Sequence, residues 1–310
     1  MNSSSEALPR ISVLVTNWHS TSFLKDLIPN LRDKAAQPDG LTFVVVDNTN
    51  GADVDLVPAL EQLGVAPPIL HQPNKTNGSE AHASALARGF QEITSPYTLV
   101  LDPDVHLIQS GWDETLIDLL DTESVVATGA AYPAWKLGKY HDFPSPIFCF
   151  SRTESLRALG ADWTPFYPSL WQRWGAKIGR QVVRLGALNT RQRCIKYPFL
   201  LRLGRSLENC LGVVGPDTGQ RLARNARKQH LKSKCFSDVF PTSPLLDADD
   251  HSPFRDIAET FELYALGDTF FMIHMGGTKH YMFHTERGYD RAYWNECLGK
   301  LSAVSPQNTA

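Results

Sequence analysis

Two aspartates one residue apart, Asp102 and Asp104, are the side chains of this sequence best placed to do chemistry. They follow a short apolar run, residues 98–101, and are separated by Pro103. A pair of carboxylates can hold a divalent cation against a phosphorylated ligand, because hard oxygen ligands suit such ions. The same residues can also be a turn that merely ends a strand, since Asp and Pro favour turns for conformational reasons. The elements around the pair must decide between these two interpretations.

The apolar run before the aspartates predicts a strand buried on both faces, which is typical of parallel sheets covered by helices. Similar runs alternate with segments of helical spacing. We predict strands at 11–16, 41–46, 69–71 and 125–130, and helices at 21–36, 54–63, 79–93 and 111–120. Strand, helix and strand in this order form right-handed βαβ units and build a parallel sheet. The prediction is an α/β fold, a Rossmann-like nucleotide-binding sheet with helices on both faces.

Polar side chains stand at the carboxyl ends of four predicted strands. A single placement of this kind means little, because Asn and Asp favour turns. Four on one edge indicate a polar ligand crevice, since open α/β sheets bind their ligands at that edge. This pattern favours a metal site over a simple turn for the aspartate pair. The residues are Asn17, Asp47, Asn48, Asn77, Asp102 and Asp104.

After residue 130 the regular alternation stops, and residues 162–211 are rich in aromatic and basic side chains. We predict a mostly helical insertion whose aromatic residues pack on the main domain. The alternative is an amphipathic element that contacts a membrane surface or clasps an acceptor. Around it we predict strands at 147–151 and 270–273 and helices at 153–159 and 220–230. The expected organisation is a first half with the regular sheet (1–135), a second half containing the insertion (136–290), and a C-terminal helix and tail (291–310).

Composition narrows the function classes. The 310 residues are 42% hydrophobic and 20% charged, an ordinary globular balance. A formal net charge of -3 argues against a nucleic-acid partner, because polyanion binders need a basic surface. The five cysteines are scattered and lack a C-x-x-C spacing, so we expect reduced thiols and a cytoplasmic location. Neither a signal peptide nor an apolar stretch long enough to cross a bilayer is recognisable.

Four segments in order resemble the family 2 glycosyltransferases of the GT-A fold: residues 13–17, 44–48, 74–89 and 101–104. The similarity covers the first half of the chain and continues more loosely to about His274. It implies an inverting, hexosyltransferase-like enzyme that moves a sugar from a nucleotide-sugar donor to an acceptor hydroxyl. It further implies Mn²⁺ or Mg²⁺ as cofactor, and a glycan, lipid-linked saccharide or small molecule as acceptor.

The resemblance also implies site residues. Asp102 and Asp104 correspond to the D-x-D pair, with Asp104 as the direct metal ligand and Asp102 as the partner of the ribose. A divalent ion there would neutralise the charge of the departing diphosphate. Asn17 and Asp47 would lie beside the nucleoside, with Asp47 accepting hydrogen bonds from the base or ribose. The predicted nucleotide-sugar set is Thr16, Asn17, Asp47, Asn48, Asn77, Gly78 and Asp102.

An inverting transfer needs a general base, which in this family is usually an Asp of an acidic pair before a helix. Asp217 occupies the matching place ahead of the predicted helix at 220–230, although Pro216 replaces the usual preceding acid. Asp249 and Asp250 are the alternatives. We favour Asp217, because a group that takes a proton should be fixed at a helix start and not in a flexible acidic loop.

His274 follows an apolar run and precedes Gly276 and Gly277, which resembles the late H-x-G-G stretch of the same family. It could complete the metal shell, contact the pyrophosphate, or be a structural histidine. Two other functions are weaker. A nucleotidyltransferase of related fold is disfavoured because residues 16–20 lack the Gly-rich, basic phosphate loop of those enzymes. A non-catalytic interaction module leaves the carboxylates unexplained.

Overall fold

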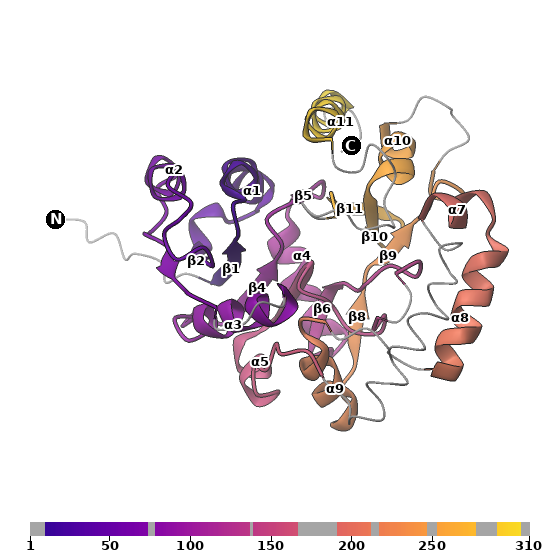
Figure 1. Ribbon diagram of the computed structural model, residues 1–310, viewed down its shortest axis with the longest axis horizontal. Coiled ribbons are helices and arrows are strands. Elements are labelled where there is room, and N and C mark those ends of the chain that lie inside the picture. Colours follow the sequence, from indigo (N-terminus) through magenta and orange to yellow (C-terminus); the bar gives the residue numbers. More distant parts are fainter. Residues whose placement is uncertain are drawn as a thin grey trace. The chain divides into compact units, whose positions relative to one another are not determined.

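The computed structural model describes residues 10–73, 78–136, 139–166, 191–211, 217–246, 253–276 and 290–304. The chain divides into two compact units (Figure 1). The first unit comprises Met1–Tyr132, Tyr140–Tyr167 and Pro216–Phe236. The second comprises Pro133–Lys139, Pro168–Gly215 and Ser237–Ala310.

The first unit is built on a seven-stranded sheet in the order β3-β2-β1-β4-β7-β6-β8. Four strands are parallel: β1 (Ile11–Asn17) pairs with β2 (Leu41–Asp47) and β4 (Tyr97–Leu101), and β2 also pairs with β3 (Ile69–Leu70). Next to them, β7 (Phe148–Arg152) is antiparallel to both β4 and β6 (Ala127–Ala130), while β8 (Ser233–Cys235) is parallel to β6. The sheet is therefore mixed but dominated by parallel pairs.

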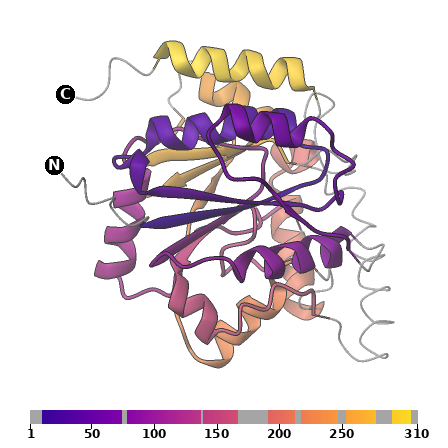
Figure 2. The same ribbon diagram turned by 90° about the vertical axis from the view of Figure 1, so that its left-hand side faces the viewer.

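Helices cover both faces of this sheet. Figure 2 shows α1 (Thr21–Lys34) and α2 (Leu56–Gln62) on one face and α3 (Gly78–Phe90) on the other. All seven residues of β1 are buried, as expected for a strand covered on both sides. Helix α3 approaches the strands closely, since a Cβ at Gly89 would lie 2.4 Å from Leu14 Cδ1 and 2.6 Å from Val46 Cγ2. The α/β prediction with helices on both faces is confirmed.

The start of helix α4 (Trp112–Thr122) contacts the end of α1 through side-chain hydrogen bonds. The Trp112 indole Nε1 donates to the Leu31 carbonyl at 3.0 Å, and the buried Asp113 carboxylate accepts the amides of Ala36 and Gln37 at 2.7 and 3.0 Å. The two carboxylate bonds give partners to backbone amides that follow the end of α1. The remaining helices of the unit are α5 (Thr153–Ala158) and α9 (Gln220–Lys228), with a short 3₁₀ turn at Pro38–Gly40.

Strand β5 (Val105–Leu107) is attached to α1 through Asn30. The Asn30 amide accepts from the Leu107 N–H at 2.7 Å and donates to the Leu107 carbonyl at 3.1 Å. This arrangement fixes the amide orientation, so the contact of 3.2 Å between Asn30 Nδ2 and His106 Nε2 makes the imidazole nitrogen an acceptor. Burial lowers the pKa of His106 from 6.5 to about 4, with Lys34 adding to the shift and Asp33 opposing it.

We expect the protein to lose stability as the pH falls from about 6.5 toward about 4, partly through His106. The unfolded chain takes up a proton near the ordinary histidine pKa, whereas the folded chain resists it until a lower pH. His106→Gln keeps an acceptor for Asn30 but does not titrate. Its melting temperature should fall less than that of the parent between about pH 7 and about pH 4.5. If the melting temperatures of the two proteins changed equally with pH, this role of His106 would be contradicted.

The second unit contains an antiparallel sheet in which β10 (Glu262–Leu266) pairs with β9 (Ser237–Val239) and β11 (Thr269–His274). Phe261 packs edge-to-face on Trp294 at 4.9 Å, which attaches helix α11 (Arg291–Val304). The other helices in the described part of this unit are α7 (Arg191–Lys196), α8 (Phe199–Leu211) and α10 (Pro253–Thr260). Trp135, Cys194 and Leu200 form a small core beside them.

The predicted elements of the first half are present within a few residues of their expected bounds, and so are the strands at 147–151 and 270–273. Several elements were not predicted: β5, β8, β9, β10 and α10. Of the predicted insertion at 162–211, residues 167–190 lie outside the described residues, and the described remainder is largely helical. In the described residues, no helix combines the length and the apolar character needed to cross a membrane.

Candidate functional site

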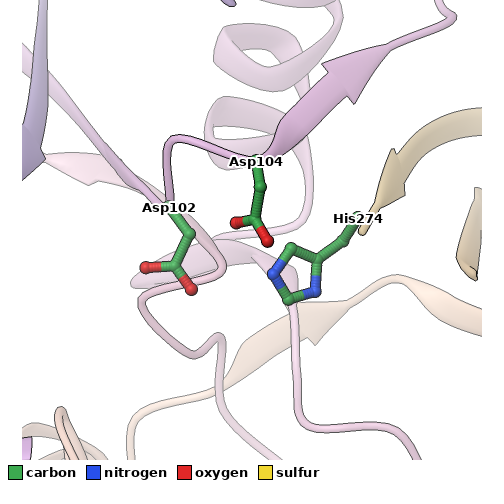
Figure 3. Close-up of side chains that lie close together, drawn as sticks. All are labelled: Asp102, Asp104 and His274. Atoms are coloured by element: carbon green, nitrogen blue, oxygen red, sulfur yellow. The ribbon is translucent and has the colours of Figure 1, made fainter. Parts of the chain in front are cut away.

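The two aspartates of the D-x-D sequence follow β4 directly. The strand is in register with β1, Leu101 lying opposite Val15, so Asp102 leaves the sheet at the edge where β1 ends. The Asp102 N–H donates to the Ile147 carbonyl at 3.2 Å, and its carboxylate is partly exposed. Asp104 is buried. Figure 3 shows both side chains on the short turn between β4 and β5.

Asn17 and Asp47 lie opposite each other at the same edge, as the last residues of β1 and β2. Asn17 Nδ2 donates to Asp53 at 2.9 Å, and Asn17 Oδ1 accepts from the Ser20 amide at 2.9 Å. The Asp47 carboxylate accepts from the Thr49 amide at 3.0 Å, the Thr49 hydroxyl at 2.7 Å and the Gly51 amide at 2.7 Å. Both side chains therefore hold the loops that follow their strands.

The side chain of the neighbouring Asn48 can accept a further hydrogen bond. Its side chain is buried, and its Oδ1 atom has no hydrogen-bond partner among the described residues. An unsatisfied buried acceptor is uncommon, because it costs the desolvation of the group without compensation. Asn48 is thus a group at this edge that a bound donor could satisfy. Thr16, also predicted here, is buried near the end of β1.

Asp217 lies just before α9 and reaches the start of α3. Ser79 Oγ donates to Asp217 Oδ1 at 3.0 Å, and Thr218 Oγ1 donates to the Ser79 carbonyl at 3.0 Å. The Asp217 N–H donates to the Gln220 side chain at 3.3 Å. A hydrogen bond also links Asp217 with the Tyr132 side chain. These contacts hold the carboxylate in one orientation.

Tyr132 connects Asp217 with the D-x-D pair. Burial raises the pKa of the Tyr132 phenol well above 10, and the negative charges of Asp217 and, more weakly, Asp102 raise it further. The phenol therefore keeps its proton and acts as a donor. Geometry relates the two carboxylates through helix α3, because Ser79 Oγ donates to Asp217 and His82, three residues later, lies 3.8 Å from Asp102.

His82 lies in the same place and was not predicted. Its Nε2 atom is 3.8 Å from Asp102 Oδ1, is buried, and has no hydrogen-bond partner among the described residues. Burial lowers the pKa of His82 to about 4, against the opposing effect of Asp217, so the imidazole is neutral near pH 7. Two signals could have identified these groups. Tyr132 follows a predicted strand end, and His82 stands one helical turn after Ser79 on α3.

His274 is the last residue of β11 and lies opposite Glu262 of β10. Its Nδ1 atom is 2.8 Å from Glu262 Oε2, and both side chains are buried. Asp102 and Asp104 of the first unit, and separately His274 of the second unit, each offer an atom that could ligate a metal ion (Figure 3). Two hard carboxylate oxygens in the set suit Mg²⁺ or Mn²⁺.

Four other predicted site residues remain to be located. Asn77, Asp249 and Asp250 lie outside the described residues. Gly78 is the first residue of α3, directly before Ser79. The ligand roles assigned to the individual residues, including Asp217 as base, stay predictions.

Comparison with known proteins gives similarity in structure only. No family model and no curated protein matches the chain. Among solved structures, it is similar to the mannosyltransferase PcManGT from Pyrobaculum calidifontis in complex with GDP-Man and Mn²⁺, at 18% identity and a TM-score of 0.39, covering 50% of this chain and 47% of that one. It is also similar to S. aureus TarS 1-349 (16% identity, TM-score 0.35, 50% of each chain) and to its complex with UDP-GlcNAc (14%, 0.37, 50% of this chain and 48% of that one).

The chain thus spans about half the length of each of these proteins. At such TM-scores the likeness supports no conclusion about the site. The function proposed below rests on the residues of this chain.

Proposed function

We propose that this protein is an inverting glycosyltransferase of the GT-A type, similar to family 2, that transfers a hexose from a nucleotide-sugar donor to an acceptor hydroxyl. The observation that carries the proposal is that helix α3 contacts both carboxylate positions: Ser79 Oγ lies 3.0 Å from Asp217, and His82 Nε2 lies 3.8 Å from Asp102, at the carboxyl end of β4. Ligands of open α/β sheets bind at this edge. Carboxylates suited to metal binding and to proton transfer meet there.

Asp102 and Asp104 would hold a divalent cation, Mn²⁺ or Mg²⁺, and His274 is the third ligand that the family resemblance implies. When bound, the ion supplies positive charge that stabilises the departing nucleoside diphosphate. Asp104 suits direct ligation, because it is the more buried of the two carboxylates and follows a strand end. Asp102 is more exposed and can also meet the ribose of the donor.

The nucleoside and sugar would lie along the ends of β1 and β2 and the start of α3. Thr16, Asn17, Asp47, Asn48, Asn77, Gly78 and Asp102 are the proposed contacts. Asn17 and Asp47 hold the loops beside these contacts, and Asn48 Oδ1, which has no partner among the described residues, can accept from a ligand donor. His82 Nε2 offers a further polar contact beside Asp102.

Asp217 acts as the general base. Its carboxylate takes the proton of the acceptor hydroxyl while the acceptor oxygen forms a bond to the anomeric carbon. The bond between that carbon and the phosphate oxygen breaks, and the nucleoside diphosphate leaves with the electron pair. Attack opposite the leaving group inverts the anomeric centre. Positioned general bases contribute about 10²–10⁴-fold to such rates.

We propose that the acceptor binds to the second half of the sequence. Under this assignment residues 1–135 bind the donor, and residues 136–290, with the insertion at 162–211, bind a glycan, a lipid-linked saccharide or a small molecule. Residues 291–310 form the C-terminal helix and tail. Replacing the insertion should change acceptor choice and leave donor binding intact.

A thermal-shift panel tests the proposal. UDP, GDP, dTDP and CDP are each added with and without Mn²⁺, and the melting temperature is recorded. We expect one nucleotide to stabilise the protein clearly more with Mn²⁺ than without it, because a ligand at about 100 times its Kd adds about 2.7 kcal/mol. Absence of stabilisation by every nucleotide in the presence of the metal would count against a nucleotide-sugar enzyme.

A further inference from the structure

Glu262 is a fully buried carboxylate at the start of β10, in a part of the second unit that is otherwise strongly apolar. Its side chain is 0% exposed. The next three residues on β10 and the three that precede His274 on β11 are buried and hydrophobic or aromatic. A carboxylate in such surroundings is costly unless it is paired and hydrogen-bonded.

Among the described residues, three side chains contact this carboxylate. Lys136 Nζ lies 2.5 Å from Glu262 Oε1, the Tyr264 hydroxyl donates to Oε2 at 3.0 Å, and His274 Nδ1 lies 2.8 Å from Oε2. The strand geometry explains two of them. Tyr264 is two residues along the same strand and so shares its face, and His274 is the direct cross-strand partner.

The charges of the cluster determine where the imidazole carries its proton. The Lys136 ammonium compensates the Glu262 charge, so the carboxylate does not require a protonated imidazole as its counter-ion. A carboxylate oxygen only accepts hydrogen bonds, so Nδ1 of a neutral His274 must carry the hydrogen. The lone pair is then on Nε2, the atom that faces away from Glu262.

We infer that Glu262 is a positioning residue that fixes the Nδ1–H tautomer of His274 and thereby presents Nε2 as a metal ligand. This inference rests on the proposed function for the identity of the metal site. A carboxylate behind a metal-binding histidine orients the ring and raises its basicity, and loss of such a partner typically weakens metal binding about 10–100-fold. An apolar residue in place of Glu262 would serve packing equally well, but it would not select the tautomer.

The first test needs no metal. The ¹⁵N chemical shifts of the His274 ring report which nitrogen is protonated, with His274→Asn identifying the signals. We expect the Nδ1–H tautomer in the parent protein and a shift toward Nε2–H in Glu262→Gln, whose amide can donate to Nδ1. A parent protein with the proton on Nε2, or a tautomer unaffected by the substitution, would overturn the inference.

The second test is a double-mutant cycle on Mn²⁺ affinity, measured by electron paramagnetic resonance of the free ion. Glu262→Gln should weaken binding about 10–100-fold in the parent and have no further effect in the His274→Ala background. An equal loss of Mn²⁺ affinity in both backgrounds would overturn the inference, because Glu262 would then affect metal binding independently of His274. Glu259→Gln, on the exposed side of α10, is the matched control and should change nothing.

The two tests separate the inference from the proposed function. If the parent protein binds no Mn²⁺, the metal role of His274 is overturned together with the proposed function, and the tautomer measurement still decides whether Glu262 orients the ring. Melting temperatures of all variants show whether they fold. Tyr264→Phe, which removes one hydrogen bond but keeps the carboxylate, is a milder variant that should retain the Nδ1–H tautomer.

Discussion

Asp104→Asn is expected to abolish metal-dependent nucleotide binding and to lower the transfer rate about 10²–10³-fold. The neutral amide removes the negative charge that holds the cation but keeps the size of a buried side chain. Charge stabilisation by a bound metal is worth several kcal/mol at the transition state, and each tenfold in rate corresponds to about 1.36 kcal/mol. The measurements are transfer kinetics and the Mn²⁺-dependent thermal shift.

Asp118→Asn is the matched control for this change. Asp118 is an exposed aspartate on α4, so its amide variant should bind and transfer like the parent. Full activity of Asp104→Asn, with a normal metal-dependent shift, would remove Asp104 from the metal site.

Asp217→Asn is expected to lower kcat about 10²–10⁴-fold while nucleotide binding persists. The amide oxygen can still accept from Ser79 Oγ and the Thr218 amide, so the local structure should be retained. What it cannot do is take the acceptor proton. Unchanged Mn²⁺-dependent stabilisation by the nucleotide, together with the lost rate, separates this role from donor binding.

Asp249 and Asp250 provide the comparison for the base. Asp249→Asn and Asp250→Asn should keep most of the transfer rate if Asp217 is the base. A fully active Asp217→Asn, with loss of activity in one of the other two variants, would move the base to the 249–250 pair.

The strands that the sequence predicts best are those whose signal is entirely local. Every residue of β1 is buried, and β2 ends in three buried residues, so an apolar run was sufficient to identify them. The position of β7 could not be predicted in this way. It lies antiparallel between β4 and β6 because of pairing between distant segments, and no residue of the run at 147–151 encodes its partners.

Strand β10 was missed for a related reason. It begins with Glu262, which breaks the apolar pattern, and the burial of that side chain depends on Lys136, far away in the sequence. Likewise, the position of Asp102 and Asp104 follows from one strand and one turn, which are local features. The grouping of Asp217 with Ser79, His82 and Tyr132 depends on three separate segments, so sequence reasoning could name Asp217 but not its partners.

Cleavage of a nucleotide sugar tests the central claim most directly. Purified protein is incubated with UDP-, GDP-, dTDP- and CDP-linked hexoses and a mixture of acceptor sugars, with Mn²⁺ or with EDTA, and ¹H NMR follows the anomeric signals. The account predicts that one donor is consumed only with the metal, that Asp104→Asn does not consume it, and that the new glycosidic bond has the opposite anomeric configuration. Failure to consume any donor with Mn²⁺ present, or equal consumption by Asp104→Asn, would contradict it.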